Sequence, residues 1–498
     1  MKKITLKKTF ALCTLLLAGH TATAQAPEIE WQKSFGSVGD DIFYDVAPTL
    51  DGGYISAGFS THDPTYPNNI AVNAIMVKTD AAGELQWQHL YGGLGDERAR
   101  KVLQNTDGTY LIAGETSSTP EGSAAILSDI WLLKIDSEGN EVWSKTFGGS
   151  DNEFLSSFEP TSDGGYVMCG YTFSNDGDVL GNHGDYDMWV VKLDTEFEIE
   201  WQACLGGETA DYGYMATETP DGDFIVTGAV QPPDNPSEYG VYKLDSEGTT
   251  VWGATFGGGW HDSPYDIAFT PNGGYIIAGQ DDSTDITDNL GGADAWLLKI
   301  DADGVQEWAK SYGSPGDDLA WGIVPVTGGY VVSGYTAADE MGAAGPNAWL
   351  FKIDEEGTVL LEETFGGNLF ERFYAFKQTD DNGFILSGTS TSNDGDLTQN
   401  NGAFDAWLVK LSPDVLGLKN STKNTLTLYP NPNNGIFTIG GDIVLDNATL
   451  NVYSTLGQLV YSDKVTQAMV LLPNLAAGVY QVQLTTGKAT YSQRLVVE

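Results

Sequence analysis

The chain has 498 residues and a formal net charge of −45, from 24 Lys and Arg against 69 Asp and Glu. Such an acidic chain excludes nucleic acid as a partner, because phosphate neutralisation needs a basic surface, and it disfavours anionic lipid. Disordered acidic chains lack aromatic residues, whereas this one has 13 Trp and 23 Tyr, so we expect it to fold, and its length suits two domains.

Residues 1–24 have the features of a signal peptide. Four lysines precede an apolar run, residues 10–19, that is too short to span a bilayer. An Ala-Thr-Ala cleavage motif ends at Ala24, which places the mature start near Gln25. We find no later transmembrane segment, so we expect export through the periplasm to the outer-membrane surface or the medium.

Seven copies of one unit fill residues 25–411, with a period of about 50–58 residues. Each copy has a short strand, a Gly turn, a second strand, a long loop, a third strand ending in Lys and, in most copies, a Trp-bearing fourth strand. The second and third strands are apolar on both faces, so both faces must be covered. This pattern predicts an all-β fold, a seven-bladed β-propeller. The third-strand lysines should pair with turn aspartates near them rather than act in catalysis; they are Lys78, Lys134, Lys192, Lys243, Lys299, Lys352 and Lys410.

The count of strands predicts that the ring closes on itself. Residues 28–36 form a fourth-strand segment that precedes every first strand, while the last copy ends at Leu411 without one. We therefore expect 28–36 to pair with residues 407–411, which leaves no exposed sheet edge. Cys169 and Cys204 should lie two strands apart in one sheet, too far for a disulfide.

The segment WLLKIDADGVQEW, residues 296–308, joins a third strand to a fourth through an Asp-Gly turn. It resembles the tryptophan-bearing repeats of kelch and quinoprotein propellers. The resemblance implies the fold alone, because nothing in the sequence indicates a quinone site, and we expect no organic cofactor.

One acidic position opens the first strand in every copy. Its functional interpretation is a ligand-binding collar around one mouth of the central channel. The structural alternative, which we favour, is that each carboxylate accepts backbone N–H groups in its own turn. The seven residues are Asp41, Glu97, Glu153, Asp211, Asp262, Asp318 and Glu371.

Two long loops share the sequence Ser-Asn-Asp-Gly-Asp, at 174–178 and 392–396, and each is followed by a further Asp. Clustered carboxylates beside a Gly turn suit calcium, although the EF-hand spacing is absent and ordinary Asx turns are the alternative. Calcium is thus the one candidate cofactor. Its candidate ligands are Asp176, Asp178, Asp187, Asp394, Asp396 and Asp405.

Residues 412–424 form a polar linker, and residues 425–498 alternate as expected for a small Ig-like β-sandwich. The Tyr-Pro-Asn-Pro opening at 429–432, the Gly-Gln turn at 457–458 and Gly-Val-Tyr at 478–480 resemble the type A C-terminal sorting domain of the Bacteroidota type IX secretion system. The resemblance implies that residues 425–498 engage the type IX secretion machinery. It also implies that the mature chain is released or attached to the cell surface.

The sequence shows no zinc-protease, nucleophile-elbow or phosphate-loop motif and so predicts no particular reaction. One hypothesis is a non-catalytic binding or adhesion propeller, whose long loops between second and third strands hold an unknown extracellular ligand, a glycan among the candidates. The alternative is an extracellular glycan-active enzyme of the glycoside hydrolase kind. It requires acids that converge in a pocket with perturbed pKa values.

Overall fold

The structure is a computed structural model. It describes residues 28–62, 72–118, 124–233, 236–283, 290–337, 345–397, 400–413, 427–429, 436–440, 445, 448–454, 459–465, 469–472, 475, 478–486 and 490–497. The chain divides into two compact units, Met1–Gly417 and Leu418–Glu498. Every regular element in the described ranges is a β-strand, and among these residues no helix could cross a membrane. The predicted signal peptide and most of the predicted linker lie outside the described residues.

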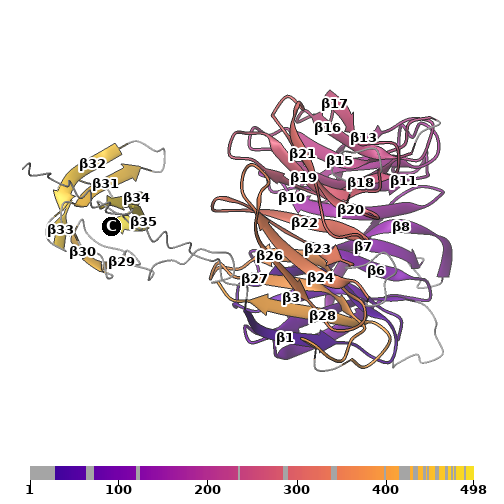
Figure 1. Ribbon diagram of the computed structural model, residues 1–498, viewed down its shortest axis with the longest axis horizontal. Coiled ribbons are helices and arrows are strands. Elements are labelled where there is room, and N and C mark those ends of the chain that lie inside the picture. The colour runs from indigo at the N-terminus through magenta and orange to yellow at the C-terminus, as the bar shows by residue number, and fades with distance from the viewer. Residues whose placement is uncertain are drawn as a thin grey trace, which may run out of the picture. The chain divides into compact units, whose positions relative to one another are not determined.

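The first unit contains seven antiparallel four-stranded sheets within its described residues (Figure 1). The first strand of each sheet, which we call the inner strand, contacts the inner strand of the next sheet, and the seventh contacts the first. The sheets therefore form a closed, β-propeller-like ring. From the inner strand outward, the first four sheets are β2 Asp41–Pro48, β3 Tyr54–Ser60, β4 Asn73–Thr79 and β5 Leu85–Tyr91; β6 Glu97–Gln104, β7 Tyr110–Ser118, β8 Ala124–Ile135 and β9 Glu141–Phe147; β10 Glu153–Pro160, β11 Tyr166–Thr172, β12 Asp187–Leu193 and β13 Ile199–Leu205; β14 Tyr212–Glu218, β15 Phe224–Val230, β16 Glu238–Leu244 and β17 Thr250–Phe256.

The remaining three sheets follow the same order, except that the outermost strand of the last one comes from the start of the chain. They are β18 Asp262–Phe269, β19 Tyr275–Asp281, β20 Asp294–Ile300 and β21 Gln306–Tyr312; β22 Asp318–Val326, β23 Gly329–Thr336, β24 Asn347–Ile353 and β25 Val359–Phe365; β26 Glu371–Gln378, β27 Phe384–Ser390, β28 Asp405–Leu411 and β1 Ile29–Phe35.

The ring closes through β1, which pairs antiparallel with β28 and sets Ile29 opposite Leu411. The Trp407 indole N–H donates to Gln32 Oε1 across this pairing, at 2.9 Å. Beyond it, Phe35 packs on Phe43 of the first sheet with ring centroids 5.9 Å apart. The last sheet thereby shares an apolar core with the first, and no edge is left between them.

Apolar cores lie between neighbouring sheets rather than on one face of each. In one cluster, Ile276 and Leu297 of the fifth sheet pack with Val332 and Phe351 of the sixth. This is why the second and third strands are apolar on both faces. Cys169 on β11 and Cys204 on β13 are free thiols separated by β12, as expected from the sequence.

Every inner strand carries a β-bulge three residues after the recurrent acid. A bulged residue is left out of the hydrogen-bonded ladder, and its side chain is turned away from the regular alternation. The register shifts leave the same position unpaired in all seven sheets: Tyr44, Arg100, Ser156, Tyr214, Tyr265, Trp321 and Tyr374.

The second unit has two described sheets around one apolar core that includes Phe437, Leu450, Val482 and Leu495. The strands of the first are β29 Thr427–Tyr429, β30 Ile436–Gly440 and β33 Met469–Leu471. Those of the second, in spatial order, are β32 Leu459–Val465, β31 Ala448–Ser454, β34 Gly478–Thr485 and β35 Thr490–Val497.

If closure stabilises the whole ring, Phe35→Ala should lower the free energy of unfolding by about 3–5 kcal/mol, because it empties a buried aromatic site in the closing core. Val38→Ala is the matched control, since Val38 lies three residues away and is 75% exposed. Urea unfolding of both variants measures the difference. Equal, small losses would show that closure does not limit stability.

Candidate functional site

The seven recurrent acids are buried, with at most 1% of each residue exposed. Each accepts a hydrogen bond from the backbone N–H four residues earlier, at 2.6–2.9 Å. In three sheets a hydroxyl at the end of the second strand bonds the other carboxylate oxygen, as Thr116 does for Glu97 at 2.8 Å. The geometry is that of the structural alternative; ligand binding by these acids remains a prediction.

Asp262 differs from its six counterparts because a second acid, Asp281, stands opposite it, where five of the other sheets have a Ser or Thr and the fourth has Val230. Burial raises the Asp262 pKa to about 8, and a hydrogen bond with the Asp281 carboxyl adds to the rise. The two carboxyls therefore share a proton near neutral pH. Ser283 supplies further donors, from Oγ to Asp262 and from its backbone N–H to Asp281.

The two Ser-Asn-Asp-Gly-Asp loops hold backbone turns in the same way. Asp176 accepts the N–H of Ser150 at 2.7 Å, and Asp178 accepts that of Gly148 at 3.2 Å. In the second loop Asp394 and Asp396 accept the equivalent N–H groups, both at 3.0 Å. Each loop thus fastens the turn that leads into the inner strand of its own sheet.

The last two candidate calcium ligands open third strands. Asp187 Oδ2 accepts from the backbone and ring nitrogens of His183, and Asp405 Oδ2 accepts from Asn401 N–H at 2.7 Å. The other oxygen of each is buried without a hydrogen-bond partner, and burial raises the Asp405 pKa. In the described part of the chain no three His, Cys, Asp or Glu residues are grouped to hold a metal ion. A calcium role remains a prediction.

The third-strand lysines are structural. Five of them pair with the Asp of the turn that follows their own inner strand. In the sixth sheet the turn has Thr327 in place of the Asp, and Lys352 donates to the Thr327 carbonyl at 3.3 Å. In the fifth sheet the turn has Asn272, and Lys299 pairs with Glu307. The five pairs are Lys78–Asp51, Lys134–Asp107, Lys192–Asp163, Lys243–Asp221 and Lys410–Asp381.

A cavity of about 390 Å³ lies at the middle of the ring, and all seven bulged residues line it. Each comes from a different inner strand, so one position of the repeat, used seven times, surrounds one space. The sequence did not reveal this position, because its residue type varies from copy to copy, whereas the acid three residues earlier recurs in all seven. The remaining lining residues are Lys101, Glu115, Leu155, Tyr171 and Arg372.

Five of the bulged residues are aromatic and contact one another around the wall. Ring centroids are 5.2 Å apart for Tyr214 and Tyr265, 4.1 Å for Tyr265 and Trp321, 5.8 Å for Trp321 and Tyr374, and 5.3 Å for Tyr374 and Tyr44. Burial raises the pKa of Tyr214, Tyr265 and Tyr374. Their hydroxyls therefore stay protonated at neutral pH and can both donate and accept hydrogen bonds.

The wall also carries cations and unsatisfied donors. Arg100 lies 4.4 Å from the Tyr44 ring and pairs with Glu115 at 3.0 Å. Arg372 makes no ion pair with another described residue, and its Nε is buried without a hydrogen-bond partner. The indole N–H of Trp321 is likewise buried without a hydrogen-bond partner. Both residues line the cavity, so these two N–H groups can donate to an acceptor placed in it.

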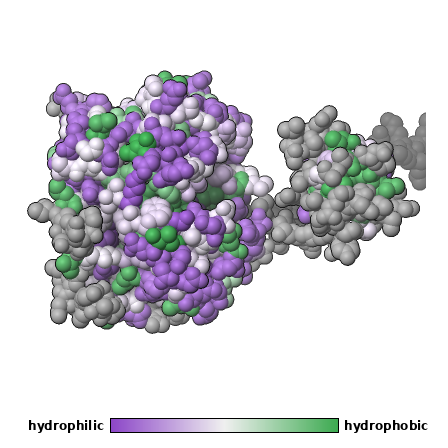
Figure 2. Space-filling view, turned by 180° about the vertical axis from the view of Figure 1, so that it is seen from behind, coloured by the Kyte–Doolittle hydropathy of each residue, from purple (hydrophilic) through white to green (hydrophobic). Residues whose placement is uncertain are grey.

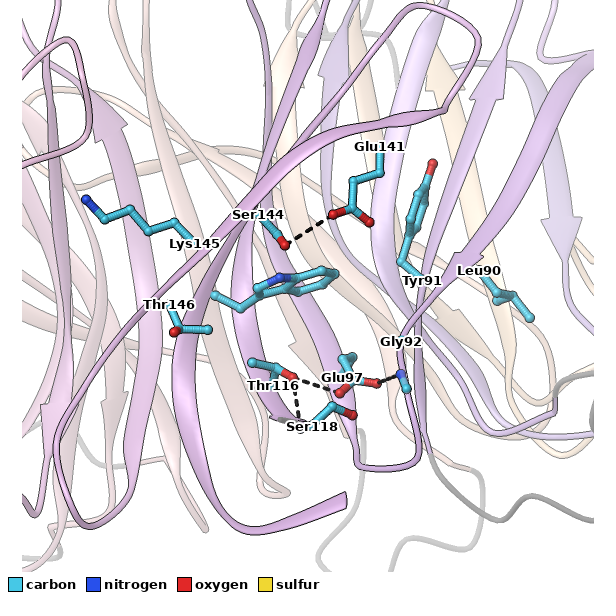
Figure 3. Close-up of a pocket in the computed structure, with 12 residues that line it drawn as sticks. Leu90, Tyr91, Gly92, Glu97, Thr116, Ser118, Glu141, Ser144, Lys145 and Thr146 are labelled. Atoms are coloured by element: carbon cyan, nitrogen blue, oxygen red, sulfur yellow. Dashed lines mark hydrogen bonds between the residues drawn. The ribbon is translucent and has the colours of Figure 1, made fainter. Parts of the chain in front are cut away.

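A second cavity, of about 440 Å³, lies between the first and second sheets near their outer strands (Figure 3). Ser144, on the fourth strand of the second sheet, lines this cavity. The equivalent residue in the third sheet is Gln202, whose side chain accepts a hydrogen bond from the Trp189 indole N–H. The shorter side chain leaves space there. Ser144 donates to Glu141 at 3.2 Å and Thr116 donates to Glu97, so these polar groups bond one another (Figure 3). We therefore regard the channel cavity as the better candidate site.

Residues 427–498 match the family model described as "Secretion system C-terminal sorting domain". The chain carries a C-terminal sorting domain. This confirms the resemblance drawn from the segments at 429–432, 457–458 and 478–480, and a sorting domain of this kind implies export by the type IX secretion system to the outside of the cell.

Upstream of the sorting domain the similarities are distant. The regulatory protein FlaEY of Caulobacter vibrioides is 24% identical over 267 residues, which cover 48% of this chain and 27% of FlaEY.

Among solved structures, PorZ, a surface component of the type IX secretion system of Porphyromonas gingivalis, is 14% identical with a TM-score of 0.42, over 93% of this chain and 60% of PorZ. The extracellular domain of BT4673 from B. thetaiotaomicron is 11% identical with a TM-score of 0.41, over 94% and 59%. The WD40 domain of Neurospora crassa Pan2 is 11% identical with a TM-score of 0.44, over 74% and 89%. The chain thus spans about three fifths of PorZ and of the BT4673 domain, and the match covers about a quarter of FlaEY.

The shared proton of Asp262 predicts a pH dependence of stability. Its pKa of about 8 in the folded state exceeds its ordinary value of 3.8, so folding takes up a proton between these values, and the free energy of unfolding falls as pH rises through that window. Asp281→Thr introduces the hydroxyl found at this position in five of the other sheets. It should stabilise the chain at pH 8 by on the order of 1 kcal/mol, with a smaller effect at pH 5.

Urea unfolding at both pH values measures this change, with Asp303→Thr as the control because Asp303 is an exposed turn residue. An unchanged pH slope in Asp281→Thr would show that the two carboxyls do not share a proton.

Proposed function

We propose that this chain is an exported, non-catalytic binding protein that holds an extracellular glycan in the cavity at the centre of its ring. In this proposal residues 1–24 direct the chain to the periplasm, and the sorting domain, with an Ig-like sandwich fold, directs it to the surface or medium. The ring of sheets is a seven-bladed β-propeller. We place the ligand on the side of the ring that carries the long loops between second and third strands, as the sequence predicts.

The observation that carries the proposal is the variation at the bulged position. The recurrent acids and lysines keep one chemistry in all seven sheets, as expected of residues that hold the scaffold. The bulged position holds Tyr, Trp, Arg or Ser, although it repeats as regularly. Such variation on a rigid scaffold is typical of a binding site.

The aromatic wall suits a sugar. Tyr and Trp present a broad apolar face for the C–H groups of a sugar ring and a polar tip for its hydroxyls. A volume near 390 Å³ falls within the range of roughly 300–1,000 Å³ typical of small-molecule sites, which is large enough for a short part of a glycan.

The glycan-active enzyme alternative has less support. Glycoside hydrolysis requires two carboxyls on either side of the scissile bond. Glu115, the carboxylate among the described lining residues, is held by Arg100 and also accepts the N–H of Leu155 at 3.3 Å. Burial raises the pKa of Asp129 and Asp294, each to about 6, but these acids do not line the cavity.

A glycan array probed with the full chain tests the proposal. We expect at least one oligosaccharide to bind, and Trp321→Ala to weaken its binding about tenfold, since an aromatic platform contributes on the order of 1 kcal/mol. Trp260→Ala is the matched control, because Trp260 is an exposed tryptophan outside the cavity.

Two results would contradict the proposal. One is binding that Trp260→Ala abolishes and Trp321→Ala leaves intact, and the other is an array without any bound glycan. Hydrolysis products from a bound glycan, detected by mass spectrometry, would instead favour the enzyme.

A further inference from the structure

The channel cavity differs in charge from the rest of the molecule. The full chain has a net charge of −45, and the face of the ring seen in Figure 2 is largely hydrophilic. The cavity wall nevertheless has three cationic side chains, Arg100, Lys101 and Arg372, and one carboxylate, Glu115, among its described residues. Only 24 residues of the chain are Lys or Arg, so this concentration requires an explanation.

Two of the three cations have carboxylates near them. Arg100 pairs with Glu115, with Nε 3.0 Å from the carboxylate. Lys101 lies close enough to Asp266 to oppose the rise in the Asp266 pKa that burial causes. Arg372 is different, because no described carboxylate pairs with it and its Nε is buried without a partner.

The position of Arg372 in the repeat does not account for this difference. Arg98 occupies the same place in the second sheet, one residue after the recurrent acid, and it pairs with Asp96 at 3.4 Å. Arg98 does not line the cavity. Arg98 and Arg372 thus occupy equivalent positions, but Arg372 is the one that lines the cavity, and no described carboxylate forms an ion pair with it.

The surroundings of Arg372 hold its guanidinium in place. Its central carbon lies 4.2 Å from the centroids of both the Tyr335 and Phe370 rings. The guanidinium also hydrogen-bonds the Tyr374 side chain, and both its charge and this hydrogen bond oppose the rise that burial causes in the Tyr374 pKa. A guanidinium fixed in this way loses little entropy on binding, and its planar N–H groups match the oxygens of a carboxylate or sulfate.

Trp321 supplies a second group that can contact a ligand in the cavity. Among the described residues that line the cavity, its indole N–H is the second buried donor without a partner, and its ring lies on Tyr265 with centroids 4.1 Å apart. We propose that the cavity binds a sugar unit carrying an oxyanion, with the sugar ring against Trp321 and the carboxylate or sulfate on Arg372. This rests on the proposed function and names its ligand class.

The acidity of the rest of the chain does not forbid such a ligand. At roughly 0.1 M salt the Debye length is about 10 Å, so surface carboxylates farther than this from the cavity are largely screened. Inside the cavity screening is weaker, and the nearby guanidinium dominates.

Isothermal titration of the full chain with matched probes tests the inference. Trigalacturonate carries three carboxylates, its fully methyl-esterified form keeps the sugar rings without the charges, and a sulfated galactose trisaccharide presents the other oxyanion. We expect one of the charged probes to bind at least tenfold more tightly than the methyl ester. Arg372→Gln should remove that difference, Arg372→Lys should restore part of it, and Arg98→Gln should preserve it.

The outcomes separate the two proposals. Equal affinity for charged and neutral probes, with loss of both in Trp321→Ala, would overturn the oxyanion inference and leave the glycan-binding proposal standing. An equal loss of affinity in Arg98→Gln and Arg372→Gln would overturn the assignment of the anion to Arg372. Failure of both charged probes to bind would overturn the inference. Binding of neutral glycans on the array would still test the proposed function independently. Unchanged melting temperatures of the variants exclude loss of folding as the cause.

Discussion

A buried carboxylate at the start of each inner strand fixes the geometry on which the rest of the ring depends. At Asp318, for example, the backbone N–H donates to the Ala293 carbonyl of the preceding sheet, while the carboxylate accepts the Ser314 N–H of the incoming turn and the Ala337 N–H beyond the second strand. One residue thus joins two sheets, a turn and a loop. The bulged residue that lines the channel, Trp321 in this sheet, follows three positions later.

The sequence predicted the parts of the structure that depend on counting and alternation. The pairing of Ile29 with Leu411 corresponds to a missing fourth strand in the last repeat. The pairing of Lys192 with Asp163 reflects a lysine near the end of one strand and an aspartate in a nearby turn of the same sheet. Both features repeat, so each is visible several times in one chain.

The channel cavity could not be recognised by repetition alone, because its chemistry differs from sheet to sheet. A physical signal was nevertheless present. Phe43 and Val46 are three residues apart in the sequence and pack in the same apolar cluster, and so do Phe373 and Phe376. A straight strand places residues an odd number apart on opposite faces, so this spacing requires a bulge between them. The absence of an anion beside Arg372 is a property of the folded chain and has no equivalent signal in the sequence.

The same carboxylates that build the scaffold also oppose its stability at high pH. Burial raises the pKa of Asp211 and Asp318 as well as that of Asp262. Each such group binds a proton more tightly when folded than when unfolded, so its contribution is complete in acid and is lost as pH rises through the folded pKa. Asparagine in their place would remove this dependence, but its amide offers one acceptor oxygen where the carboxylate offers two. Asp318 uses both oxygens, one for each of the two segments it holds, which gives a physical reason for a carboxylate at this position despite the desolvation it requires.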